Sequence, residues 1–264
     1  MPELPEVETI CRQLNKVLAG QRIKGLQGST LKVVGKRILG VKWKAKMIII
    51  ELSKGVSLLI HLKMTGQLLY EENEKRKTKN EKRKYTRAIF ELDKGKLYFN
   101  DLRRFGWIKL VTNKELKEQL AKLPPDVVDK EFSEKYLQRI LVSSRRAIKL
   151  VLLDQSKMGG VGNIYTNEAL YCAGIDPRRP ANSCGLQVRN PQGCIKKVIN
   201  RGIKYGGSTA SDENFVNALG KPGKYQEHFL VYEKAGEKCR QCKQKIIKVK
   251  LGGRGTYYCP GCQK

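Results

Sequence analysis

The chain begins MPELPEVETICRQLNKVLAG (1–20), and this stretch predicts that the fold opens on a helix. Apolar residues recur in it at helical spacing, namely Val7, Ile10, Cys11, Leu14, Val17 and Leu18. Pro5 suits the first turn of a helix and Gly20 follows its end, so we expect a helix over residues 5–19.

Pro2 stands directly behind a methionine that can be removed, and Glu3 follows it. Removal of Met1 would expose a secondary amine, which no internal residue can supply. Such an amine can attack the anomeric carbon of a nucleotide sugar, expel the base and leave an iminium ion that stays cationic. Glu3 is placed to protonate the opening sugar ring. The alternative is that the Pro-Glu pair merely opens the helix.

The net charge points to a polyanionic partner. The chain carries 53 Lys and Arg against 25 Asp and Glu, a formal charge of +28. Nucleic acid and an anionic membrane surface both fit that excess. The longest apolar candidate is MIIIEL (47–52), well short of the roughly 18 residues of a membrane span, and the N-terminus does not resemble a signal peptide. We therefore expect a soluble, intracellular protein that binds nucleic acid.

The eight cysteines fall into two groups. Four have the spacing C-x2-C-x16-C-x2-C and predict one closed, tetrahedral, structural zinc site: Cys239, Cys242, Cys259 and Cys262. So short a segment has too little core to fold alone, and zinc binding would supply its folding energy. The other four are scattered and are expected to be free thiols in a reducing compartment: Cys11, Cys172, Cys184 and Cys194.

The pattern of residues between about 22 and 111 is typical of β-strands. Short apolar runs alternate with turn residues, as MIIIEL, VSLLIHL, AIFEL, KLYF and WIKLV, and DKG (93–95) predicts a hairpin turn. The run EKRKTKNEKRK (74–84) interrupts this region with seven basic residues in eleven. It is either a mobile, solvated loop or a loop that follows phosphates. The pattern predicts a sheet-rich first domain.

KLPPDVV (122–128) has the composition of a linker, and after it the periodicity becomes helical. Four helices are expected, in FSEKYLQRIL, AIKLVLLD, IYTNEALYCAG and CIKKVINRGI. A glycine-rich turn in DQSKMGGVGNIYTNEAL (154–170) precedes the third. Backbone amides at such a helix start bind anions, and Asn163 can add a side-chain donor. An ordinary turn between helices is the alternative.

Three further residues and one hairpin are candidates for contacts with DNA. HLKMTG (61–66) and DLRRFG (101–106) place Met64, Arg103 and Phe105 near strand ends, where they could form a wedge that fills the space of an extruded base. The alternative is that Met64 and Phe105 are core residues. LGGRGTYYC (251–259) predicts a hairpin that brings Arg254 close to a phosphate. A solvated arginine on a turn is the alternative.

With these residues in place, the sequence resembles the bacterial formamidopyrimidine-DNA glycosylase family, the 8-oxoguanine glycosylase/lyases. The likeness runs from PELPEVET to the final C-x2-C, through HLKMTG, DLRRFG, GGVGNIYTNEAL, GGST, GKPG and RGTYYCPGC. It implies an α+β multidomain fold: an N-terminal β-sandwich with an N-terminal helix, a helix–two-turns–helix domain and a C-terminal zinc ribbon. The implied boundaries are 1–115, a linker at 116–130, 131–228 and 229–264.

The resemblance also implies a role for each matching residue. Pro2 would be the nucleophile and Glu3 its acid/base partner, while Glu6 would support the N-terminus. The implied catalytic set is Pro2, Glu3, Glu6, Lys46 and Arg254. The implied DNA-binding set combines phosphate contacts with an intercalating wedge: Lys46, Asn163, Lys248 and Arg254 for the former, and Met64, Arg103 and Phe105 for the latter.

Three positions depart from the family pattern. Leu102 replaces the proline of DPRRFG, KYTR (84–87) lacks the usual histidines, and the segment 206–220 is slightly longer than the family's. In the family this segment closes over the extruded purine, so its departure from the pattern bears on lesion preference.

The resemblance therefore implies a bifunctional glycosylase and abasic-site lyase for oxidised purines, acting by an N-terminal proline Schiff base and β,δ-elimination. Its expected partner is double-stranded DNA with oxidised or abasic nucleotides, and its expected cofactor is one structural Zn²⁺. We expect a monomer that is located in the bacterial cytoplasm and associated with the nucleoid. An endonuclease VIII-like enzyme for oxidised pyrimidines is one alternative, although Leu4 argues against its usual PEGPE start. A non-catalytic, zinc-containing nucleic-acid binder is the other.

Overall fold

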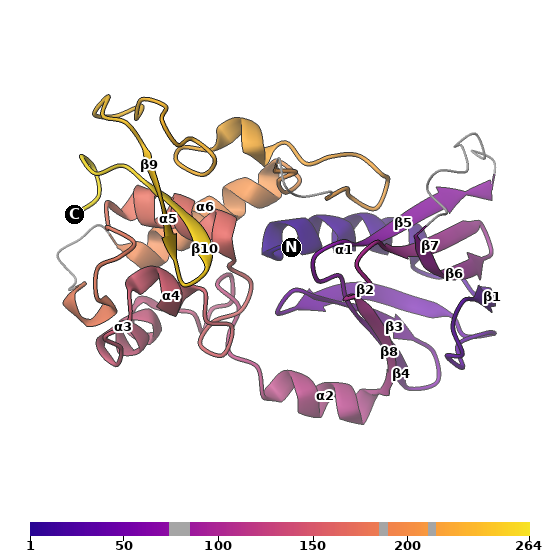
Figure 1. Cartoon of the computed structure of the whole chain (residues 1–264). Coiled ribbons are helices and arrows are strands. Elements are labelled where there is room, and N and C mark those ends of the chain that lie inside the picture. Colours follow the sequence, from indigo (N-terminus) through magenta and orange to yellow (C-terminus); the bar gives the residue numbers. More distant parts are fainter. Residues whose placement is uncertain (74–84, 185–189, 211–214) are drawn as a thin grey trace. The chain divides into compact units, whose positions relative to one another are not determined.

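The computed structural model describes residues 1–73, 85–184, 190–210 and 215–264, and the chain forms two compact units (Figure 1). The first contains Met1–Lys122 together with Tyr205–Gln226, and the second contains Leu123–Lys204 together with Glu227–Lys264. The basic run 74–84, expected to be a loop, lies outside the described residues. No helix in the described part of the chain is long and apolar enough to cross a membrane.

The first unit opens on helix α1 (Leu4–Leu18), which confirms the helix expected from the sequence. Glu3 is its N-cap and forms a capping box with Glu6, so the first turn has partners for amides that the helix itself leaves unpaired. The buried face of α1 faces the core of the unit and includes Ile10, Leu14 and Leu18.

Two four-stranded antiparallel sheets form a β-sandwich in this unit, with strand orders β1-β6-β7-β5 and β2-β3-β4-β8. The five strand-like runs of the sequence all lie in strands, and the DKG turn joins β6 to β7. The strands are β1 (Ile23–Gln27), β2 (Ile38–Lys44), β3 (Met47–Leu52), β4 (Val56–His61), β5 (Gly66–Glu72), β6 (Thr86–Leu92), β7 (Gly95–Asp101) and β8 (Trp107–Thr112).

Side-chain alternation along β3 shows how the sandwich is filled. Ile48 and Ile50 point into the main core, which α1 and both sheets share. Ile49 points to the opposite face, into a smaller cluster that includes Leu116 of helix α2 (Asn113–Ala121). Because successive side chains of a strand face opposite sides, the continuous apolar run MIIIEL is buried on both faces.

The segment Tyr205–Gln226 belongs to the first unit although it follows the helices of the second. Phe215 and Ala218 are part of the sandwich core. The amide of Ala218 donates to Oε1 of Gln13 at 3.0 Å, and its carbonyl accepts from the amide of Tyr70 at 2.8 Å. The segment is thereby fixed to α1 and to β5.

The second unit contains the four helices expected from the sequence and a two-stranded ribbon. Ser133 caps the first of these helices, and Gly162 precedes the third, so the glycine-rich turn does lie at a helix start. The elements are α3 (Glu134–Val142), α4 (Ile148–Leu152), α5 (Asn163–Ala173), the short 3-10 helices η3 (Ala181–Ser183) and η4 (Tyr225–His228, which begins in the first unit), α6 (Pro191–Lys204), β9 (Ile247–Leu251) and β10 (Arg254–Tyr258).

The cysteines outside the spaced set are not all thiols. A disulfide joins Cys172 in α5 to Cys194 in α6, whose Cα atoms are 5.7 Å apart, a separation usual for such a bond. Cys11 and Cys184 are free. The expectation of four free thiols is therefore wrong for two of them, because helix packing brings together residues that lie 22 positions apart in the sequence.

Candidate functional site

The start of the chain is held by one buried carboxylate. Glu6 is 1% exposed. Its Oε2 accepts the amide of Glu3 at 2.8 Å, and its Oε1 accepts the amide of Ser208 at 2.7 Å. Pro2, which directly precedes Glu3 in the sequence, is buried, and Glu3 is 3% exposed. The structure therefore brings Glu3 and Glu6 together and ties both to the GGST motif.

Gly207 allows this approach. Its φ is +82°, and an added Cβ would lie 2.9 Å from Cγ of Glu6 and 3.1 Å from its Cα. A side chain at this position would therefore both strain the backbone and push the segment away from α1. Glycine is required here by the packing of the segment on the first turn of the helix.

Lys46 lies in the tight turn between β2 and β3 and is only 3% exposed. Ala45 and Lys46 have φ values of 48° and 65°, the left-handed region that non-glycine residues seldom adopt. Strained backbone of this kind accumulates at functional sites. The turn thus places Lys46, a buried lysine, directly before the apolar strand β3.

His61, at the end of β4, has a pKa that burial and the positive charge of Lys46 help to lower. Burial, followed by the charges of Lys63 and Lys46, lowers the pKa of His61 to about 4. The imidazole is therefore neutral near pH 7. Its Nδ1 accepts the amide of Lys63 at 3.0 Å, which leaves the proton on Nε2. The low pKa of His61 depends on burial and on two lysines, which its position in the sequence motif HLKMTG does not reveal.

The expected wedge residues are exposed. Met64 and Phe105 are 44% and 54% exposed, which rules out the alternative that they are core residues. The Arg103 guanidinium lies 4.9 Å from the centre of the Phe105 ring, in a cation–π contact. Exposed apolar side chains on two neighbouring loops are available to contact a partner.

A single buried carboxylate joins the two wedge loops. Asp101, 1% exposed, accepts the Thr65 hydroxyl at 2.5 Å through Oδ1 and the Gly106 amide at 2.6 Å through Oδ2. The amide of Arg103 donates to Oδ1 at 3.2 Å and to the Thr65 hydroxyl at 2.9 Å. Asp101 therefore fixes loop 61–66 against loop 101–106, a role that motif reading alone did not reveal.

In the second unit, α4 and α5 hold the ribbon hairpin. Asn163 Nδ2 donates to the carbonyl of Gly255 at 3.2 Å, and Lys149 Nζ donates to the same carbonyl at 2.8 Å. Lys149 also donates to the Thr256 hydroxyl at 2.8 Å and is fully buried. From the sequence, Lys149 is expected only to lie in a helix. The signal that could have marked it as buried is its position among the apolar residues Ile148, Val151 and Leu152, which are all buried.

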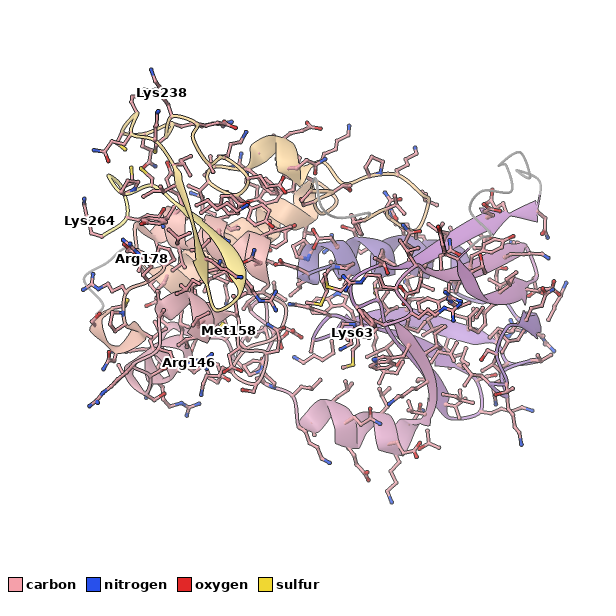
Figure 2. The ribbon with its side chains drawn as sticks, in the orientation of Figure 1. Lys63, Arg146, Met158, Arg178, Lys238 and Lys264 are labelled. Atoms are coloured by element: carbon pink, nitrogen blue, oxygen red, sulfur yellow. A yellow bond between two sulfur atoms is a disulfide. The ribbon has the colours of Figure 1, made fainter. Side chains whose placement is uncertain are left out.

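Arg254 and Lys248 lie on the ribbon that these contacts support. Arg254 is the exposed first residue of β10, next to Gly255. Lys248, in β9, pairs with Tyr257 in the ladder, and its Nζ is 5.3 Å from the Tyr257 ring. The expected hairpin is confirmed, and its cationic side chains are exposed. Other cations such as Lys238 project outward from the same unit (Figure 2).

Glu168, in the middle of α5, organises the chain before the ribbon. Its carboxylate accepts the amides of Leu230, Val231 and Tyr232 at 2.9–3.1 Å. Burial raises the pKa of Glu168, while the three amides act in the opposite direction. A glutamate is ordinary in a helix, so no pattern in the sequence singles this residue out.

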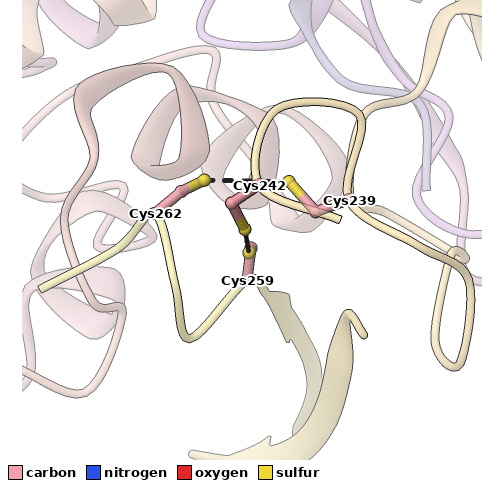
Figure 3. A group of neighbouring side chains, drawn as sticks. All are labelled: Cys239, Cys242, Cys259 and Cys262. Carbon is pink, nitrogen blue, oxygen red and sulfur yellow. Dashed lines mark hydrogen bonds between the residues drawn. The ribbon is translucent and has the colours of Figure 1, made fainter. Parts of the chain in front are cut away.

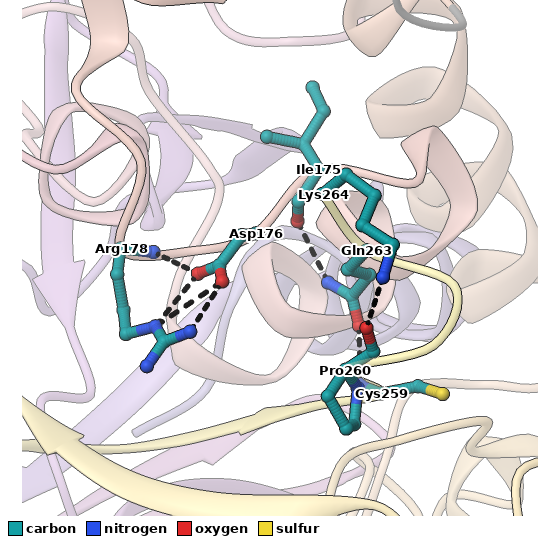
Figure 4. A network of polar contacts seen from close by, with 7 residues as sticks. All are labelled: Ile175, Asp176, Arg178, Cys259, Pro260, Gln263 and Lys264. Atoms are coloured by element: carbon teal, nitrogen blue, oxygen red, sulfur yellow. Dashed lines mark hydrogen bonds and ion pairs between the residues drawn. The ribbon is translucent and has the colours of Figure 1, made fainter. Parts of the chain in front are cut away.

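The four spaced cysteines converge as predicted (Figure 3). All four Sγ atoms lie within 4.8 Å of one another, which suits a tetrahedral zinc with Zn–S bonds of about 2.3 Å. Four thiolates complete the coordination, so one structural zinc fits and no position is left for a substrate. The second knuckle is docked by Gln263, which accepts the Cys259 amide and donates to the Ile175 carbonyl, both at 2.8 Å (Figure 4).

The expected site residues thus form two groups, one in each unit. Pro2, Glu3 and Glu6 share the first unit with the wedge loops and with Lys46. The residues expected to bind the lesion phosphates, namely Asn163, Lys248 and Arg254, share the second unit with the four cysteines.

Comparison with known proteins finds family matches in the regions that contain both groups of expected site residues. The Formamidopyrimidine-DNA glycosylase N-terminal domain matches residues 1–108, the H2TH domain of the same enzymes matches 123–214, and the zinc finger found in FPG and IleRS matches 236–264. The formamidopyrimidine-DNA glycosylase of Desulfitobacterium hafniense is 35% identical over 100% of both chains. That of Desulforamulus reducens is 38% identical over 100% of this chain and 99% of its own.

Solved structures agree as well. The complex between Lactococcus lactis Fpg and DNA containing an abasic site has a TM-score of 0.89 and 32% identity, with 100% of both chains covered. A complex of the same L. lactis protein with DNA containing an oxidised pyrimidine has a TM-score of 0.88, at the same identity and coverage. Full-length identity above 30% and matches in all three domains show that this chain belongs to the formamidopyrimidine-DNA glycosylase family.

Proposed function

We propose that this protein is a bifunctional DNA glycosylase and abasic-site lyase that excises oxidised purines, 8-oxoguanine and formamidopyrimidines, from duplex DNA. The observation that carries the proposal is the Glu6 carboxylate, which holds the start of the chain against the Gly207–Ser208 turn. The L. lactis relatives, solved with DNA containing an abasic site or Fapy-dG, support the same substrate class.

The chemistry begins at Pro2 after Met1 is removed. The neutral secondary amine attacks C1′ of the damaged nucleotide, the glycosidic bond breaks, and the base leaves with that electron pair and takes up the proton that the amine nitrogen loses. Glu3 protonates O4′ as the sugar ring opens, which gives an iminium ion. Loss of a C2′ proton then expels the 3′ phosphate by β-elimination, and δ-elimination expels the 5′ phosphate.

The remaining site residues bind and deform the DNA in this proposal. Lys46 contacts the phosphate beside the extruded nucleotide, and Asn163, Lys248 and Arg254 bind the phosphates around the lesion. Met64, Arg103 and Phe105 fill the space that the nucleotide leaves, which offsets part of the few kcal/mol that extrusion costs. Asp101 positions both loops of this wedge.

The division of labour follows the domains expected from the sequence. The proposed functional scheme is a catalytic domain at 1–115, a linker at 116–130, a helix–two-turns–helix domain at 131–228 and a zinc ribbon at 229–264, although Tyr205–Gln226 belongs to the same compact unit as the catalytic domain. The zinc is structural, so it supports the ribbon and takes no part in bond breaking. The proposed enzyme is a monomer that works in the bacterial cytoplasm, at the nucleoid.

Borohydride trapping tests the nucleophile. Protein lacking Met1, mixed with DNA containing 8-oxoguanine or an abasic site, should form a covalent adduct when the iminium ion is reduced. The adduct should be lost in Pro2→Gly and in protein that retains Met1, and kept in the control Pro5→Gly. Trapping that survives unchanged in Pro2→Gly would place the nucleophile elsewhere. No trapping by any form would favour a non-catalytic binder.

The choice of lesion tests the substrate class. Excision of 8-oxoguanine opposite cytosine should be faster than excision of thymine glycol under single-turnover conditions. The reverse order would assign the protein to oxidised pyrimidines, as in endonuclease VIII-like enzymes.

Salt dependence tests the phosphate contact of Arg254. Since each neutralised phosphate releases counterions, Arg254→Ala should weaken binding to all sequences alike and reduce the slope of log K against log salt by roughly one unit. Arg178→Ala is the matched control, because the Arg178 guanidinium is already paired with Asp176 at 2.7 Å. A slope that Arg254→Ala leaves unchanged would mean that Arg254 does not touch phosphate.

A further inference from the structure

One face of α5 is a polar stripe that points at the ribbon. Asn163, Asn167 and Tyr171 are spaced four residues apart, so they lie on the same side of the helix. Asn163 donates to the Gly255 carbonyl at 3.2 Å, and Asn167 Oδ1 accepts the Tyr257 amide at 2.8 Å. The third member of the stripe reaches the metal site.

The Tyr171 hydroxyl lies 3.2 Å from Sγ of Cys239, within hydrogen-bonding distance for sulfur. Both side chains are removed from solvent, with Tyr171 3% exposed and Cys239 fully buried. Water therefore cannot easily replace the contact. A phenol hydroxyl can donate or accept, but a thiolate that binds zinc has no proton to give. With zinc in the site, Tyr171 is the donor and the Cys239 thiolate the acceptor.

Cys239 already receives the backbone amides of Gln241 and Cys242, and Cys259, the first cysteine of the second knuckle, receives those of Gly261 and Cys262. These amide contacts are a property of each C-x2-C turn. The Tyr171 hydroxyl is different in kind, because it comes from a helix outside the ribbon. It lies on the same stripe that holds the hairpin beside Arg254.

We propose that the Tyr171 hydroxyl is an outer-sphere hydrogen-bond donor that holds the zinc-binding thiolate of Cys239 and raises the affinity of the ribbon for zinc. Four thiolates around one Zn²⁺ leave a net charge of −2, and the Cys239 side of that charge is buried. A donor aimed at one sulfur stabilises that charge and fixes the orientation of the ligand.

The test compares wild-type protein with Tyr171→Phe, which removes the hydroxyl and keeps the ring. The matched control is Tyr136→Phe, which also removes a phenol hydrogen bond in the same unit, 2.8 Å to the Lys157 carbonyl, but on α3. Two readouts use the full-length chain. The first is zinc affinity, by competition with a chelator. The second is the thiolate-to-cobalt charge-transfer band after replacement of zinc by Co²⁺.

Loss of an outer-sphere partner typically weakens metal binding 10–100-fold, so Tyr171→Phe should bind zinc roughly tenfold more weakly, and Tyr136→Phe as tightly as wild type. A hydrogen bond stabilises the sulfur lone pair, so its loss should also move the charge-transfer band to longer wavelength. An unchanged band position would overturn the proposal even if zinc affinity fell, because the loss would then come from packing. Unchanged zinc affinity would overturn it as well.

Discussion

The arrangement at the start of the chain depends on the Glu6 carboxylate. A buried charge is costly unless it is hydrogen-bonded, and both oxygens of Glu6 accept backbone amides, from Glu3 and from Ser208. Each hydrogen bond to a charged group contributes about 1.5–3 kcal/mol. One side chain thus fixes the residue that follows Pro2 and the segment 205–226, and the proposed amine has a defined position because of it.

The second unit uses the same kind of constraint for its cationic hairpin. Lys149 and Asn163 both donate to the carbonyl of Gly255, so the backbone next to Arg254 is held from α4 and from α5. The polar stripe of α5 extends this support to the metal site through Tyr171. Contacts from α4 and α5 therefore hold the hairpin that carries the exposed cations, and α5 also contacts the cysteine cluster.

Much of the fold could be predicted because its signals are local. The period of α1, the apolar strand runs, the DKG hairpin and the spacing of the four cysteines each depend on residues close in sequence. The Cys172–Cys194 disulfide, the return of Phe215 and Ala218 to the first core, and the buried partners of Asp101 and Lys149 depend on tertiary packing. Composition and periodicity carry no information on such contacts. The motif is enough to recognise Pro2, Glu3 and Glu6. Only the structure reveals that the amide of Ser208 donates to Glu6.

The most direct test of this account is the rate of borohydride trapping by Glu6→Gln on saturating abasic DNA. Glutamine keeps the shape of the side chain, but its NH₂ group cannot accept an amide, so one of the two hydrogen bonds is lost. Loss of 1.5–3 kcal/mol of positioning predicts a rate at least roughly tenfold below wild type. Glu8→Gln, on the same helix, should trap at the wild-type rate. Equal rates for Glu6→Gln and wild type would contradict the claim that this carboxylate positions the nucleophile.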